Sequence, residues 1–129
     1  MLRIISSREM EMFRGDVGSF VYKIPSGVTE QGVTTYYEFQ PGDIIKLDIF
    51  ELKSDHQTPL KEIVTEVESE TESVTINISS TDSQIGEPSP KAVEYAFEIS
   101  LNDINTTTGY DTEEGEAIFR IKPAKASDV

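Results

Sequence analysis

The sequence predicts an all-β protein, folded as a sandwich of short antiparallel strands. Three observations favour this fold class. Apolar residues recur at every second position through most of the chain, as they do in strands that bury one face. The same runs are rich in β-branched and aromatic residues, which fit a pleated sheet. Turn-forming Gly, Pro, Asn and Asp separate the runs at roughly ten-residue intervals, a spacing typical of sandwiches and barrels.

Three strands are expected in the N-terminal half of the chain. Residues 9–13 alternate glutamate with methionine, and residues 20–24 alternate aromatic or aliphatic side chains with polar or smaller ones. Residues 43–52 are more apolar, but Lys46 and Asp48 interrupt one of the two faces. This third segment therefore predicts a strand that is buried mainly on one side.

Four further strands are expected in the C-terminal half. Residues 60–67 and 74–78 alternate, and the second of these segments is β-branched at most apolar positions. Residues 93–102 give the clearest pattern, because five apolar side chains fall on one face that a helix would scatter around its circumference. The last strand is expected at residues 117–122 and is closed by Pro123, which has no N–H to donate to a sheet.

Three connections carry turn signals. Residues 14–16, with a central glycine, predict a tight hairpin turn between the first two strands. Residues 66–73 contain four glutamates and predict the exposed tip of a hairpin between the fourth and fifth strands. Residues 80–85 predict a short helical turn that crosses between sheets, begun by Ser80 or Thr81 and ended by a glycine.

Length and composition fit one domain over residues 1–129, with frayed ends at residues 1–7 and 124–129. The absence of cysteine excludes disulfides, thiolate metal sites and thiol nucleophiles. Twenty-four acidic against eleven basic residues give a formal charge of −13, which repels phosphate backbones and anionic membrane surfaces. We therefore expect no nucleic-acid partner and no membrane partner. No apolar run has the length of a signal peptide or a membrane span.

No arrangement of residues predicts catalysis, so we expect that the protein is not an enzyme. The single histidine, His56, is expected to be a solvated loop residue, and no nucleophile turn accompanies it. Residues 111–116 gather acidic side chains as calcium loops do, but without the ligand spacing of an EF-hand. We expect no metal site, no catalytic residue and no cofactor.

Four residues form the candidate interaction surface: Tyr36, Tyr37, Tyr110 and Asp111. Aromatic faces stack on sugar rings, and neighbouring amide or carboxylate groups bind sugar hydroxyls. These residues predict, as an alternative function, a carbohydrate- or cell-surface-binding β-sandwich module. The other interpretation is structural, with tyrosines at strand ends half-packed into the rim of the sandwich.

The order of turns and strands resembles a known family. The residues that carry the resemblance are 13–20 (FRGDVGSF), 41–49 (PGDIIKLDI), 95–101 (YAFEISL), Gly115 and 119–123 (FRIKP). This order resembles the small immunoglobulin-like domain at the N-terminus of upper baseplate proteins in phages and prophages of Gram-positive bacteria. The resemblance covers nearly the whole chain, but Glu98 stands where the family usually has aspartate.

The resemblance implies an immunoglobulin-like antiparallel β-sandwich of about seven or eight strands. It implies a structural or assembly protein of the virion, in the tail or baseplate, that acts by protein–protein association after assembly in the bacterial cytoplasm. The expected partners are other tail or baseplate proteins, and a homo-oligomer stays open. The chain lacks the coiled coil and receptor-binding part of a full baseplate protein, so the resemblance implies an attachment module or a small accessory virion protein. Residues 9–13 or 117–122 are the expected sheet edges, with Arg120 and Lys122 as charges that prevent aggregation.

Overall fold

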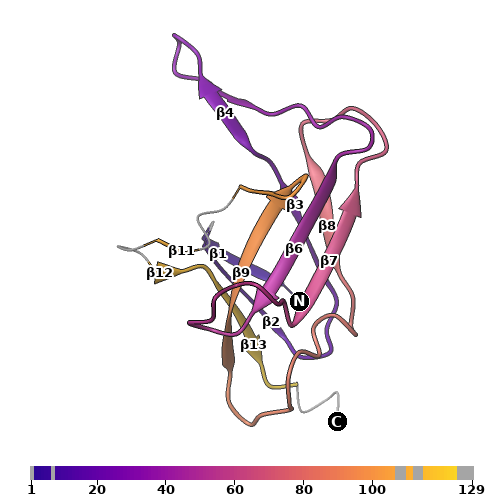
Figure 1. Cartoon of the computed structure of the whole chain (residues 1–129), viewed down its shortest axis with the longest axis vertical. Helices are drawn as coiled ribbons and strands as arrows, with labels where there is room; N and C mark the ends of the chain where they lie inside the picture. Colours follow the sequence, from indigo (N-terminus) through magenta and orange to yellow (C-terminus); the bar gives the residue numbers. More distant parts are fainter. Residues whose placement is uncertain (1, 7, 107–109, 112–114, 125–129) are drawn as a thin grey trace.

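The computed structural model describes residues 2–6, 8–106, 110–111 and 115–124, and it is all-β, as the sequence predicts (Figure 1). A large sheet has the strand order β1-β2-β13-β9-β6-β7, and β10 also pairs with β9. All its pairs are antiparallel except β2 with β13, which run parallel. The strands are β1 (Arg3–Ser6), β2 (Glu9–Phe13), β6 (Ile44–Phe50), β7 (Lys61–Glu66), β9 (Val93–Leu101), β10 (Ile104–Asn105) and β13 (Ile118–Lys122).

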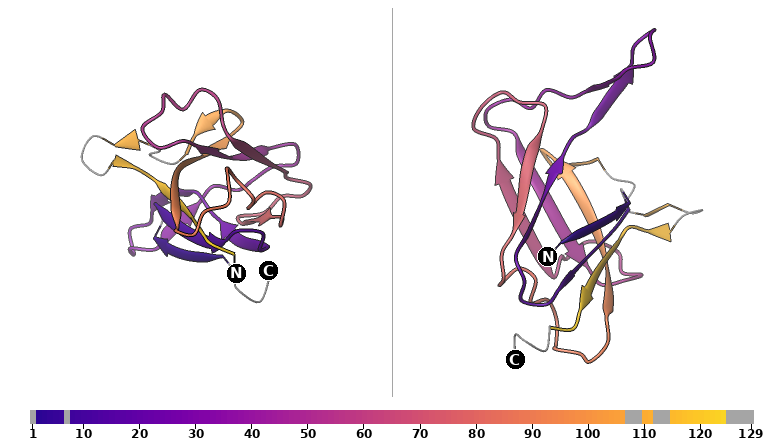
Figure 2. Two further views of the ribbon diagram at one scale, coloured as in Figure 1. Left: turned by 90° about the horizontal axis from the view of Figure 1, so that it is seen from below. Right: turned by 180° about the vertical axis from the view of Figure 1, so that it is seen from behind.

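A second, smaller layer packs against this sheet and completes the sandwich (Figure 2). It consists of β3 (Gly18–Tyr22) and β8 (Val74–Ile78), which pair antiparallel along their whole length. The core lies between the layers. Alternate residues of β6 and β8 are buried there, and Phe39, Phe97 and Phe119 are among the largest fully buried side chains. Burial of these aromatic rings supplies much of the apolar area that stabilises the fold.

Two short hairpin-like pairs complete the described chain. β4 (Pro25–Val28) and β5 (Thr34–Tyr36) pair with each other and form an arm that projects from one end of the sandwich (Figure 1). β11 (Tyr110–Asp111) pairs with β12 (Gly115–Glu116) beside the large sheet. Among the described elements, the arm extends farthest beyond the two layers.

All seven strands predicted from the alternation are present, with ends that differ by two residues at most. The expected helical turn is also present as a single turn, in which the Ser83 N–H bonds to the Ser79 carbonyl at 3.1 Å. Ser79 begins it, because its hydroxyl accepts from the Asp82 N–H while the Asp82 carboxylate accepts from the Ser79 N–H. The turn lies between β8 of the small sheet and β9 of the large one.

Both predicted hairpins are wrong, although both turns exist. The turn at residues 14–16 is closed by the Asp16 N–H bonding to the Phe13 carbonyl, but it leads from β2 in the large sheet to β3 in the small one. Residues 66–73 likewise cross between the sheets, because β7 pairs with β6 and β8 pairs with β3. A strand, a turn and a second strand give the same local pattern in a hairpin and in a crossover.

The expected edge strands are also wrong. β2 lies between β1 and β13, and β13 lies between β2 and β9, so the edges of the large sheet in the described chain are β1 and β7. β1 falls within residues 1–7, which the sequence predicts to be frayed. All four of its residues are exposed, so no burial pattern signals the strand. At the other terminus, residues 125–129 lie outside the described residues.

Candidate interaction site

The open side of the sandwich contains an apolar groove of about 670 Å³. Its floor is formed by Met10, Phe97 and Ile99, which are almost completely buried. One wall comes from β3 and the residues that follow it, and the other from β1. The lining residues are Ile4, Ser6, Arg8, Met10, Phe20, Val21, Tyr22, Lys23, Ile24, Pro25, Tyr36, Phe97, Ile99 and Thr106. The volume and apolar character lie within the range of ligand- and peptide-binding pockets.

The groove exists because the small sheet has two strands. Within the described chain β3 pairs with β8 alone, so its other edge has no neighbouring strand. Phe20 and Tyr22 alternate toward the core and line the groove, while the backbone beside them follows this free edge. Unpaired N–H and C=O groups at an edge are a template for another strand.

Two contacts hold β3 against neighbouring segments. Leu2 packs on Gly18, where a Cβ would lie 2.6 Å from the Leu2 Cβ, so only glycine fits there. Farther along β3, the Tyr22 hydroxyl hydrogen-bonds the Thr106 hydroxyl. Burial raises the pKa of Tyr22 above its ordinary value.

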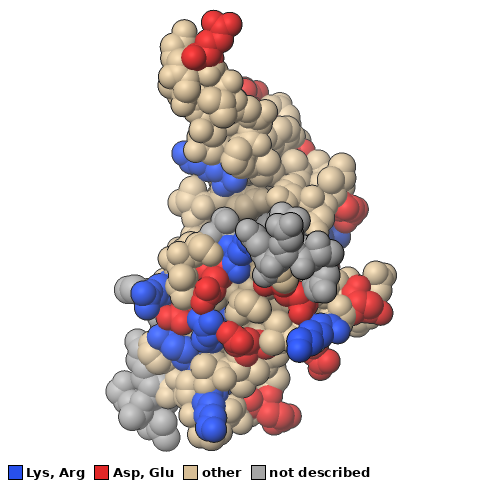
Figure 3. Space-filling view, turned by 90° about the vertical axis from the view of Figure 1, so that its left-hand side faces the viewer, with Lys and Arg blue, Asp and Glu red and all other residues tan. Residues whose placement is uncertain are grey.

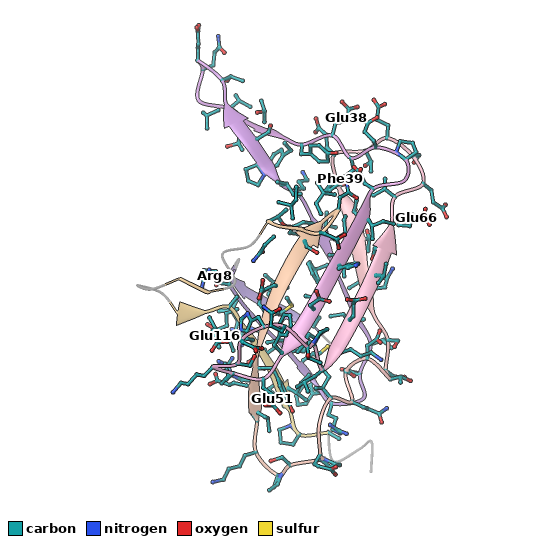
Figure 4. The ribbon with its side chains drawn as sticks, in the orientation of Figure 1. Arg8, Glu38, Phe39, Glu51, Glu66 and Glu116 are labelled. Atoms are coloured by element: carbon teal, nitrogen blue, oxygen red, sulfur yellow. The ribbon has the colours of Figure 1, made fainter. Side chains whose placement is uncertain are left out.

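The rim of the groove is basic in an otherwise acidic protein. Lys23 lies over the ring of Tyr36, with its Nζ 4.9 Å from the ring centroid. Arg8, labelled in Figure 4, donates to the Gly115 carbonyl on β12. Figure 3 shows basic side chains at the base of the arm, acidic ones at its tip, and both kinds mixed on the body below. The groove therefore favours a segment that combines apolar and acidic residues.

The structure separates the predicted interaction residues. Tyr36 lines the groove, whereas its neighbour Tyr37 points the other way, donates to the Asp43 carboxylate at 2.8 Å and packs edge-on against Phe39. Tyr37 thus follows the structural interpretation of a tyrosine packed into the rim. The side chains of Tyr110 and Asp111 lie outside the described residues. The glycan-binding alternative stays a prediction, supported in the described part by Tyr36 alone.

His56 is not the solvated residue that the sequence predicts. Its side chain is 11% exposed, it stacks on Phe50 with 4.7 Å between ring centroids, and its two ring nitrogens bond Glu98 and Glu116. Figure 4 shows Glu116 beside the loop between β6 and β7, which carries His56. The second carboxylate oxygen of Glu116 accepts a hydrogen bond from the Lys53 N–H at 2.6 Å. The partners lie 42 and 60 residues farther along the chain, so no local sequence signal reveals them.

Two rows of charged residues cross the outer face of the large sheet. In the first, which we call the Arg120 row, Arg120 on β13 stands between Glu11 on β2 and Glu94 on β9, and it also bonds Glu9. Arg120 therefore neutralises three carboxylates on the two strands that flank β13 rather than guarding a free edge. In the second, the Asp48 row, Asp48 on β6 stands between Glu62 on β7 and Glu98 on β9.

The Asp48 row lines a polar cleft of about 280 Å³ together with His56 and Lys46. Burial first, and then the neighbouring Glu62, raise the pKa of Asp48 to about 6. One oxygen of Asp48 is buried without a hydrogen-bond partner. The cleft holds a histidine and several carboxylates, yet the described residues contain no group of three His, Cys, Asp or Glu side chains placed to hold a metal ion. Of residues 111–116, positions 112–114 lie outside the described part.

Fold and groove together define a β-sandwich with an open strand edge beside an apolar, basic-rimmed groove. Comparisons with protein-family models, with curated proteins and with solved structures found no match to this chain. In the described residues, no helix has the length and apolar character needed to cross a membrane.

Proposed function

We propose that this chain is an immunoglobulin-like assembly module that acts by protein–protein association, as a structural component of a phage or prophage tail or baseplate. The observation that carries the association is the free edge of β3 beside the apolar groove. A partner segment added along β3 gains main-chain hydrogen bonds from the edge. Its alternate side chains enter the groove, as in other cases of strand addition.

The strand order supports an immunoglobulin-like topology. In the variable-type domain one sheet has the order G-F-C-C′, and strands B and E pair in the other. β13-β9-β6-β7 and β3-β8 follow the same orders. In that fold strand A lies beside B, whereas here the first strands, β1 and β2, belong to the large sheet. The position beside β3 is thus the one where a further strand fits the topology.

The phage role is supported by the turn-and-strand resemblance and by chemistry that suits a scaffold. The Arg120 row neutralises charged side chains on the large sheet, and the groove offers an apolar surface beside an open strand edge. A module of this kind contributes affinity through shape and backbone pairing rather than through a reaction.

Quantitative mass spectrometry of particles purified from an induced culture tests the proposal. The chain is expected in the particles at a fixed ratio to the tail proteins. Ile4→Asp places a charge in the groove at an exposed position and should remove the chain from particles, while Val64→Asp on the outer face of β7 should not. Absence of the wild-type chain from the particles would overturn the virion role, and equal incorporation of both variants would overturn the role of the groove.

A further inference from the structure

We infer that the segment bound in the groove is the β4–β5 arm of a second copy of this chain, and that two copies exchange arms reciprocally. This inference rests on the proposed function, because it uses the same groove and names its occupant. It adds that the module associates with itself.

The arm exposes apolar side chains that no other described part of the chain covers. All four residues of β4 are exposed, and Val28 and Val33 near the tip are 69% and 60% exposed. Its turn is ordered, since the Thr29 N–H bonds to the Val33 carbonyl at 2.8 Å and the Gly32 N–H bonds to the Thr29 carbonyl at 2.9 Å. A two-stranded hairpin is marginal by itself in water, so covering one face of it would stabilise the arm considerably.

The position of the arm makes exchange reciprocal. β4 continues from β3 after two residues, and Pro25 and Tyr36 at its base line the groove. The tip, flanked by Val28 and Val33, therefore lies the length of the arm away from the groove of its own copy. A twofold axis between two antiparallel arms places each tip at the other copy's groove, which gives a closed, isologous dimer.

The chemistry of the arm complements that of the groove. The arm, residues 25–36, contains one acidic residue, Glu30, and no basic residue, whereas Arg8 and Lys23 stand at the rim of the groove. Val28 and Val33 match the apolar floor, and the free edges of the arm match the free edge of β3. In the dimer, Glu30 of one copy faces the basic rim of the other.

The first test is the oligomeric state of the full chain, measured by analytical ultracentrifugation over a concentration series. The wild type is expected to dimerise, and Val28→Asp or Val33→Asp should weaken dimerisation by at least about tenfold, because each buries a charge in an apolar groove. Val64→Asp is the matched control at an exposed valine of β7 and should leave the dimer unchanged. All three positions are exposed, and circular dichroism verifies that the variants fold.

A charge swap tests the contact between tip and rim. Glu30→Lys and Lys23→Glu should each weaken the dimer by about three- to tenfold, because like charges then meet at both contacts. Mixing the two variants should restore wild-type affinity, since each Lys then faces a Glu in the mixed dimer.

A monomer at every concentration, a dimer that Val64→Asp abolishes, or a mixture that stays weak would each overturn arm exchange. The outcome is separable from that of the proposed function. A monomer whose incorporation into particles still depends on Ile4 keeps the groove as a site for a segment of another protein. An arm-exchanged dimer that is absent from particles keeps this inference and overturns the virion role.

Discussion

The Arg120 row and the Asp48 row have the same construction but opposite electrostatics. Each crosses three strands of the large sheet with a central residue directly opposite two carboxylates. In the Arg120 row the central residue is a guanidinium. In the Asp48 row it is a third carboxylate, and like charges directly opposite one another on a sheet are destabilising.

The pKa shifts record this difference. Burial alone would raise the pKa of Glu11, but its hydrogen bond to Arg120 and the charges of Lys122, Arg120 and Arg3 outweigh burial and lower it. In the Asp48 row, Lys46 lies on the same strand as Asp48 but pairs with Asp103 at 3.1 Å, and burial and Glu62 raise the pKa of Asp48 to about 6. The same geometry thus stabilises one region of the sheet and costs free energy in the other.

The largest effect is expected from removing the cation of the Arg120 row. Arg120→Met keeps the length of the side chain but leaves Glu9, Glu11 and Glu94 together without their shared partner. The free energy of unfolding should fall by about 2–3 kcal/mol, as when one member of a partly buried ionic network is lost. Urea denaturation measures the change. Lys122→Met is the control, because in the described chain Lys122 pairs with one carboxylate, Glu11 at 3.6 Å, and otherwise lies over the Phe13 ring. An equal loss from both variants would show that Arg120 has no special role.

A smaller loss is expected at the end of the Asp48 row, where His56 lies between the carboxylates of Glu98 and Glu116. His56→Phe keeps the ring stacked on Phe50 but removes the bonds to Glu98 and Glu116. The free energy of unfolding should fall by about 1–2 kcal/mol, and limited proteolysis should cut the loop between β6 and β7 faster. Gln57→Ala in the same exposed loop should change neither rate nor stability. A His56→Phe protein as stable as the wild type would mean that stacking alone holds the loop.

The dependence of stability on pH follows from the same histidine. Burial alone would lower the pKa of His56, but the hydrogen bonds and charges of Glu116 and Glu98 outweigh it and raise the pKa above 6.5. The folded protein therefore binds this proton more tightly than the unfolded chain does. The contribution of His56 is complete below pH 6.5 and is lost as the pH rises through the raised pKa. Melting temperatures measured over this window should fall in the wild type and stay flatter in His56→Phe; equal slopes would contradict the assignment.

The sequence predicted those parts of the fold in which burial leaves a periodic pattern. β8 alternates buried and exposed residues, and β9 buries the alternate residues Tyr95, Phe97 and Ile99, so both strands were located closely. β1 and β4 are exposed throughout and carry no such pattern. Which strands pair with one another could not be predicted, because a strand's partner can be distant in the sequence and the local pattern does not identify it. The same limit applies to the site. Tyr36 was singled out as one of a pair of neighbouring tyrosines, but the groove combines β1, β3 and β9, and His56 acts through distant glutamates.

The smallest effect, and the one of opposite sign, is expected at the centre of the Asp48 row. Asp48→Asn removes one of three adjacent carboxylates and gives the site an amide that can donate to Glu62 or Glu98. Because its pKa is raised, Asp48 binds a proton more tightly in the folded protein than in the unfolded chain. The free energy of unfolding of the wild type therefore falls as the pH rises from 3.8 to about 6. Above that range the Asp48→Asn variant should be more stable than the wild type by about 0.5–1 kcal/mol, less than the full shift implies because water screens this partly exposed row.

Urea denaturation of Asp48→Asn at neutral pH and at pH 4 separates this explanation from a packing effect. The gain in the free energy of unfolding should be present at neutral pH and nearly absent at pH 4, where Asp48 is already protonated in the folded state. Glu51→Gln, which removes an exposed carboxylate outside the row, should give no comparable gain. A gain that is equal at both pH values would place the cost of Asp48 in its buried, unbonded oxygen rather than in the charge of its neighbours.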